Sequence, residues 1–147
     1  MKTLPNDKQE ILNRIAALRP DSPRQWGKMT CAQMICHLSD AFLAPLGEIE
    51  VKPGPVPVPR AVFKFAALRL PMKWPQGVKT RPEVEQGVGG TPPSEFEADR
   101  AKLVSLVERF VAEGSNKNHA IFGKMTEDDW MRWGYLHCDH HLRQFGV

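Results

Sequence analysis

Apolar residues recur three or four positions apart in four stretches of the chain, and this spacing predicts four long α-helices. The stretches are residues 6–18, 30–43, 94–113 and 126–144. Thr30 and Thr126 are placed as N-caps, and Gln33 completes a capping box with Thr30. Pro20 and Gly114 stand where two of the helices should end. The pattern therefore predicts an all-α fold, built as a four-helix bundle.

Short motifs refine the starts of these helices. The tetrapeptide GKMT occurs at residues 27–30 and again at 123–126, each time directly before a predicted helix. Ser94 and Glu97 have the spacing of a capping box at the start of the third helix. The repeated order of helix, loop and helix predicts two helical hairpins in an up-and-down bundle.

The segment between the second and third helices has a different composition. Residues 52–93 hold nine of the 13 prolines, a density that excludes long helices and central strands. The stretch RAVFKFAALRL, residues 60–70, is compatible with one short helix. We therefore expect a long proline-rich crossover between helices 2 and 3.

Length and composition are those of one globular domain. The chain has 147 residues, 41% of them hydrophobic and 25% charged, so residues 1–147 are expected to form a single domain. Its three cysteines are an odd number without a CxxC pair, which favours a reduced, intracellular protein. Because no run has signal-peptide or transmembrane length, we expect a cytoplasmic protein without a membrane partner.

Charge is unevenly distributed along the chain. Residues 51–82 contain seven Lys or Arg and no Asp or Glu, although the net charge is only +3. A nucleic-acid binder usually shows a continuous basic stripe, so no nucleic-acid partner is predicted. Two alternatives remain for the segment: a solvated face, or a cover over a site that attracts an anionic small-molecule substrate. Its basic side chains include Lys64, Arg69, Lys73, Lys79 and Arg81.

Histidines concentrate in YLHCDHHLRQF, residues 135–145. At about 100° per residue, His137 and His141 lie one turn apart on an apolar stripe, whereas His140 is turned about 100° away. His37 lies on the apolar stripe of the second helix. Each of these could be a core histidine with one hydrogen bond. However, unpartnered buried imidazoles cost about 1–3 kcal/mol each, and a shared divalent metal removes that cost.

Two neighbouring residues are expected to stay off the metal. Cys138 follows His137 directly and therefore points about 100° away from it. His119 lies in the loop before the last helix and is expected to anchor that loop, with a position near the open end of the site as the alternative.

The motifs around these histidines carry a family resemblance. GKMTCAQMICHLSD and FGKMTEDDWMRWGYLHCDHHLRQFG, with their HxxHHxxQ ending, resemble the DinB/YfiT-like superfamily of metalloenzymes, closest to an uncharacterised DinB-like bacterial branch. The resemblance covers residues 1–50 and 94–147, and the crossover only loosely. It implies a four-helix bundle with a divalent metal (Zn, Ni, Fe or Mn) near one end of the core. The implied ligands are His37, His137 and His141.

The resemblance also implies chemistry. The superfamily is similar in fold to bacillithiol transferases and to the mycothiol-dependent maleylpyruvate isomerase, so a low-molecular-weight thiol is a candidate cofactor. Three histidine ligands leave coordination positions open, as in catalytic sites. We therefore expect a metal-dependent hydrolase or thiol S-transferase acting on a small molecule. The alternative is a non-catalytic bundle that binds a metal or ligand and acts as an interaction protein.

Two further residues are candidates for catalysis. Asp40, one turn after His37, is a candidate carboxylate behind that ligand or a fourth ligand. Gln144, one turn beyond His141, is a candidate holder of a metal-bound water. The alternatives are a solvent-facing Asp40 and a Gln144 that makes a hydrogen bond at the end of the bundle.

Oligomeric state is the last expectation. The resemblance implies a homodimer, and aromatic residues outside the predicted core stripes support it. These residues are Trp26, Phe63, Phe65 and Trp74.

Overall fold

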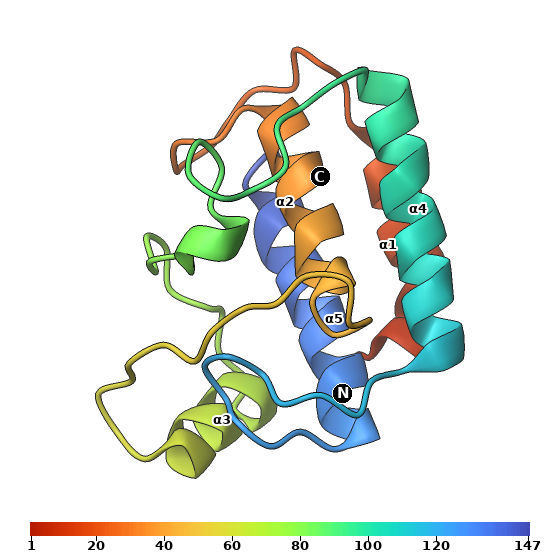
Figure 1. Cartoon of the computed structure of the whole chain (residues 1–147). Helices are drawn as coiled ribbons and strands as arrows, with labels where there is room; N and C mark the ends of the chain where they lie inside the picture. Colours follow the sequence, from red (N-terminus) through yellow and green to blue (C-terminus); the bar gives the residue numbers. More distant parts are fainter.

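The computed structural model describes residues 1–147 and is helical throughout (Figure 1). The helices are α1 (Leu4–Ala17), α2 (Cys31–Leu43), α3 (Arg60–Arg69), α4 (Phe96–Glu113) and α5 (Glu127–Arg143), with a short 3-10 helix η1 (Pro82–Val84). There is no strand, only an isolated bridge between His119 and Gly123. The predicted all-α class is confirmed. None of the helices combines the length and the apolar character that a bilayer crossing needs.

Helix α1 packs against α4 and α5, and α2 packs against the same two helices (Figure 1). Helices α1 and α2 are therefore diagonal to each other, as are α4 and α5, and neither pair forms a main packing contact. The predicted pairing into two hairpins is wrong. Short loops force consecutive helices to be neighbours, but the connections over residues 18–30 and 114–126 are long enough to cross the bundle.

The two GKMT copies form the same local structure. Gly27 and Gly123 both have positive φ, 87° and 71°, and each copy ends on a threonine N-cap. Thr30 accepts a bond from the Gln33 backbone N–H, and the Gln33 side chain accepts one from Thr30 N–H, at 3.1 and 2.9 Å. Thr126 makes the same reciprocal pair with Asp129. Both helices thus begin where the sequence predicts.

The third predicted cap is wrong. The N-cap of α4 is Glu95, whose carboxylate accepts bonds from Glu97 and Ala98 N–H. Ser94 lies before the cap and donates its backbone N–H to Asp99. Any side-chain acceptor near the helix start satisfies these N–H groups, so the spacing of Ser94 and Glu97 was not decisive. Gly114 does end α4, with φ 64°.

One apolar cluster of 24 buried residues draws on all five α-helices. Its centre is aromatic: the Phe42 ring lies 5.2 Å from Phe110 and 5.8 Å from Trp133, centroid to centroid. Each such side chain contributes about 1.5–3 kcal/mol by burial. Leu68 brings α3 into the same cluster, so the crossover packs on the core.

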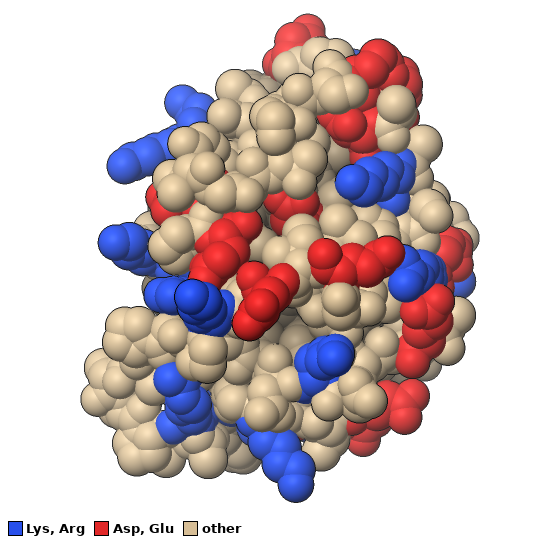
Figure 2. Space-filling model, in the orientation of Figure 1, with Lys and Arg blue, Asp and Glu red and all other residues tan.

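The crossover is held at several points. α3 packs against α5, and η1 packs against α2. Near its end, Thr91 donates its backbone N–H and its hydroxyl to the two carboxylate oxygens of Asp40, both at 2.7 Å. In the lower left of the face in Figure 2, where α3 lies in Figure 1, the charged side chains are Lys and Arg, set among uncharged residues.

Candidate metal centre

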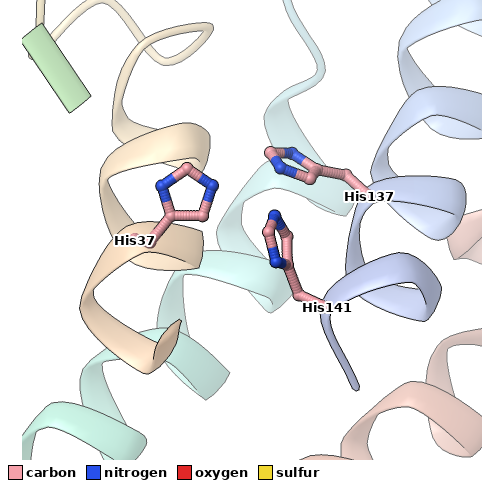
Figure 3. Close-up of side chains that lie close together, drawn as sticks. All are labelled: His37, His137 and His141. Atoms are coloured by element: carbon pink, nitrogen blue, oxygen red, sulfur yellow. The ribbon is translucent and has the colours of Figure 1, made fainter. Parts of the chain in front are cut away.

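Three imidazoles meet between α2 and α5. His37 comes from α2, and His137 and His141 come from successive turns of α5 (Figure 3). One ring nitrogen from each lies within 4.8 Å of the others. The ring centroids are 5.4 Å apart for His37 and His137, 4.6 Å for His37 and His141, and 4.9 Å for His137 and His141. We call these residues the histidine triad.

Two triad rings are already oriented by oxygen acceptors. His37 Nδ1 lies 3.1 Å from the Val84 carbonyl oxygen, and His141 Nδ1 lies 3.0 Å from Gln144 Oε1. An acceptor at Nδ1 places the ring proton there and leaves the Nε2 lone pair free. This is the usual support of a metal-binding histidine, whose other ring nitrogen donates to an oxygen.

His137 differs from the other two. Its Nδ1 is buried and has no hydrogen-bond partner. An orphaned polar nitrogen of this kind costs about 1–3 kcal/mol unless a ligand compensates for it. The ring packs at 5.0 Å from Trp133, which fixes its position on α5.

The triad is neutral at physiological pH. Burial lowers the pKa of His37, and it lowers the pKa of His137 and His141 well below the ordinary value. Each neighbouring imidazolium would lower the pKa of His137 further. Neutral imidazole is the form that binds a metal, so a proton does not compete for these ligands near pH 7.

The arrangement fits a divalent ion. Zinc–nitrogen bonds of about 2.0–2.1 Å in a tetrahedral site place ligand nitrogens roughly 3.4 Å apart. The triad nitrogens lie within 4.8 Å of one another, so they would have to approach by up to about 1.4 Å to reach that spacing. Three imidazoles without a carboxylate suit Zn, Ni or Fe better than the oxygen-seeking Mn.

The triad borders a cavity of about 430 Å³. All five histidines of the chain lie on its wall, although only three belong to the triad. The remaining wall is mostly apolar and includes Phe63, Trp74, Phe122 and Trp133. No Asp or Glu lines it. The periodicity of α5 could not reveal that His119 and His140 share this space, because the loop and the crossover complete the wall.

Asp40 does not join this site. It is fully buried, so the expectation of a solvent-facing residue is wrong. Both of its oxygens are occupied by Thr91, it makes no hydrogen bond to a triad histidine, and it does not line the cavity. Its observed role is to fix the end of the crossover on α2.

Gln144 bonds to His141 and thereby positions that ring. Its own placement depends on Gly27, since a Cβ atom at that position would come 2.1 Å from Gln144 Nε2. The Gln144 carbonyl also accepts a 2.7 Å bond from Gln25 N–H. The first GKMT copy therefore supports the triad as well as starting α2.

His140 and Cys138 lie outside the triad, as the helix geometry predicted. His140 lies between Trp26 and Trp74, with ring centroids 4.8 and 6.0 Å away. Burial lowers the pKa of His140 to about 4. Cys138 is completely buried in the core, and burial raises the pKa of its thiol to about 12.

The five basic residues of the crossover named above divide into two groups. Lys64 and Arg69 bind the buried Asp129 carboxylate at 2.9 and 2.6 Å. They therefore belong neither to a solvated face nor to a cover that attracts an anionic substrate. Lys73, Lys79 and Arg81 line the cavity. The aromatics proposed for a dimer also have partners within the chain, except Phe65, which is 60% exposed.

Comparison with known proteins gives one match. A family model described as Protein of unknown function (DUF1569) matches residues 4–146. No curated protein and no solved structure matches the chain.

Proposed function

The chain belongs to the DUF1569 family, and from its histidine triad we propose that it is a divalent-metal-dependent enzyme acting on a small molecule. We include in this proposal a DinB/YfiT-like four-helix bundle in which α1, α2, α4 and α5 are the bundle helices and residues 52–93 form the crossover. A cytoplasmic homodimer is part of the same proposal: the cytoplasm is inferred from the cysteines and from the lack of a signal-peptide or membrane-spanning run, and the dimer mainly from the resemblance.

One observation carries the proposal: three neutral imidazoles converge, and two of them are pre-oriented by Val84 and Gln144. A structural metal site normally has four protein ligands, whereas a triad leaves positions for a reactant. The triad also opens on a cavity large enough for a small molecule. A site that served only to staple the helices would need neither feature.

The reaction type is either hydrolysis or transfer to a thiol sulfur. When bound, the metal supplies Lewis-acid chemistry, which polarises a carbonyl or lowers the pKa of a coordinated group. The chain's own triad residues would hold the ion, with Val84 and Gln144 orienting two of the rings. No cysteine of the chain lines the cavity, so in a thiol transferase the sulfur comes from a low-molecular-weight thiol.

A second function has one observation in its favour. The wall of the cavity is mostly apolar, as small-molecule sites are whether or not they are catalytic, so binding alone already accounts for it. In that case the chain is a non-catalytic metal- or ligand-binding bundle and acts as an interaction protein.

The two functions are separated by turnover. Metal content is measured on the purified protein, and the protein is then screened against ester, amide and electrophile substrates, with and without several thiols. Turnover that is lost with chelator, regained with added metal and absent in His137→Ala supports the enzyme. A metal-loaded protein that binds ligands but turns none over in any metal form contradicts it and supports the binding function.

A further inference from the structure

His119 is the cavity histidine whose role the triad does not explain. It lies in a tight turn closed by two backbone bonds, His119 N–H to Gly123 O at 2.7 Å and Gly123 N–H to His119 O at 2.9 Å. Its ring stacks on Phe122 with centroids 4.5 Å apart. The side chain is therefore held in one orientation on the cavity wall.

The turn also fixes the tautomer of His119. Nδ1 accepts bonds from the backbone N–H groups of Ile121 and Phe122, at 3.1 and 3.2 Å. A nitrogen that accepts carries no proton, so the neutral ring has its N–H at Nε2. Burial lowers the pKa of His119 to about 4, and the ring is neutral near pH 7.

The Nε2–H group of His119 has no partner in the protein. This nitrogen is accessible. The histidine nitrogens that are both buried and without a partner are Nδ1 of His137 and Nδ1 of His140, and His119 Nε2 is not among them. Since the residue lines the cavity, this rigid donor is available to a molecule inside it. A preorganised N–H in an apolar site is a strong contact for a negatively charged oxygen.

Arg81 stands beside the same turn. A Cβ atom at Gly54 would come 2.8 Å from Arg81 Cδ and 3.0 Å from Ile121 Cδ1, so the three residues pack together. Gly54 N–H also bonds to Ala120 O within the turn. Arg81 Nε is buried without a hydrogen-bond partner, and Glu83, the carboxylate paired with it, is 3.9 Å away.

The charged side chains on the cavity wall indicate the charge of the ligand. Lys73, Lys79 and Arg81 line the cavity, and no carboxylate does. Lys73 and Lys79 have no ion pair with any acidic residue. An anionic ligand is therefore favoured in the cavity over a cationic organic one.

We propose that His119 and Arg81 form a binding site for the carboxylate of a small apolar acid whose hydrocarbon part fills the cavity. Such an acid is a substrate only if the chain is the proposed enzyme, so this part of the proposal rests on the proposed function. The binding itself requires no metal. The volume of about 430 Å³ is within the range of small-molecule sites.

The test uses the full chain after treatment with chelator, so that a carboxylate cannot bind a metal instead. Octanoate, 1-octanol and octylamine are titrated in turn and followed by calorimetry and by tryptophan fluorescence. Trp74, Trp130 and Trp133 line the cavity and report its occupation. Octanoate is expected to bind at least about 10-fold more tightly than the other two, the gain typical of a charge-assisted contact.

Variants assign the contacts. Arg81→Met keeps the apolar stem and should weaken octanoate about 10-fold without weakening 1-octanol. Arg19→Met is the matched control, because Arg19 is exposed and its side chain makes no bond. His119→Asn keeps an acceptor for the turn but has no donor at the Nε2 position, whereas His119→Gln extends an amide donor toward it. The octanoate affinities should therefore fall in the order wild type, Gln, Asn, while thermal stability is higher for Asn than for Gln.

Equal affinities for octanoate and 1-octanol, or octanoate binding unchanged in both Arg81→Met and His119→Asn, would overturn the proposal. If octanoate does not bind selectively but the protein binds a full complement of metal, the carboxylate site is wrong and the metal-dependent function stands. If octanoate binds selectively but the protein never binds metal, the carboxylate site stands and the metal-dependent function is wrong.

Discussion

The two ends of α5 both bury polar side chains, but only one end satisfies them. At the N-terminal end, the Asp129 carboxylate caps the helix through Thr126 and binds Lys64 and Arg69. Burial alone would raise the pKa of Asp129, but the Thr126 N–H and the Lys64 ammonium outweigh it and lower the pKa. The buried Asp129 carboxylate therefore has hydrogen-bond and ion-pair partners for both of its oxygens within the chain.

At the C-terminal end, the histidines remain incompletely paired. His137 and His140 each keep a buried Nδ1 without a partner, and three rings present a nitrogen to one point. A completed network stabilises the fold, whereas an incomplete one beside a cavity is suited to a ligand. From this difference we infer that the N-terminal end of α5 stabilises the fold and that the C-terminal end binds a ligand.

Removing Asp129 should have the largest effect on stability. The Asp129 side chain is 7% exposed, whereas Lys64 and Arg69 are 23% and 32% exposed. Asp129→Ala should lower the free energy of unfolding by about 4 kcal/mol, about 3 from the broken ion pairs and about 1 from the lost hydrogen bond with Thr126 N–H. Chemical denaturation measures it, with the exposed Asp128→Ala as control. Equal stability of the two variants would mean that this cluster does not hold α3 to α5.

The turn at His119 should give a pH-dependent effect. Its pKa of about 4 in the folded chain lies below the ordinary 6.5, so its contribution to stability is present above pH 6.5 and is lost as the pH falls toward 4. In chelator-treated protein, the wild type should lose about 3 kcal/mol relative to His119→Asn over that window. Denaturation curves at several pH values measure the difference. Parallel pH profiles would show that the ring is not buried in neutral form.

Gln144 should tune the metal site without forming it. Gln144→Met removes the acceptor of His141 Nδ1–H and should weaken zinc binding roughly 10- to 100-fold. Gln76→Met is the control, since Gln76 is exposed and makes no side-chain bond. Calorimetric zinc titration distinguishes the two. A loss of less than threefold at Gln144 would show that packing alone holds the ring.

His140 should have the smallest effect on metal binding. It neither belongs to the triad nor hydrogen-bonds a member of it, so His140→Ala should change zinc affinity by less than about 10-fold. The variant should instead change the fluorescence of Trp26, which packs on its ring. Loss of the zinc site in this variant would mean that the ligands are misassigned.

Local patterns in the sequence were sufficient for the helices and for the faces of α2 and α5. The capping boxes at Thr30 and Thr126 and the stripe through His137 and His141 depend on residues within a few positions of each other. Such short-range signals determine helix starts and helix faces, and they led to the triad.

Contacts across the crossover could not be predicted in this way. The Asp40–Thr91 bonds and the Lys64–Asp129 pair join residues far apart in sequence, and no periodicity encodes them. The diagonal placement of α1 and α2 has the same origin, because a long loop permits several packings. The placement of all five histidines around one cavity follows from that packing and not from their spacing.

Zinc titration of the chelator-treated protein tests the central claim most directly. Wild type should bind one zinc ion per chain, and His37→Ala, His137→Ala and His141→Ala should each lose that site while circular dichroism stays helical. Two remaining imidazoles hold a divalent ion far less tightly than three, and the apolar core does not depend on the ion. A wild type that binds no zinc, or a His137→Ala variant that binds it as tightly as wild type, would contradict the assignment of the triad as a metal centre.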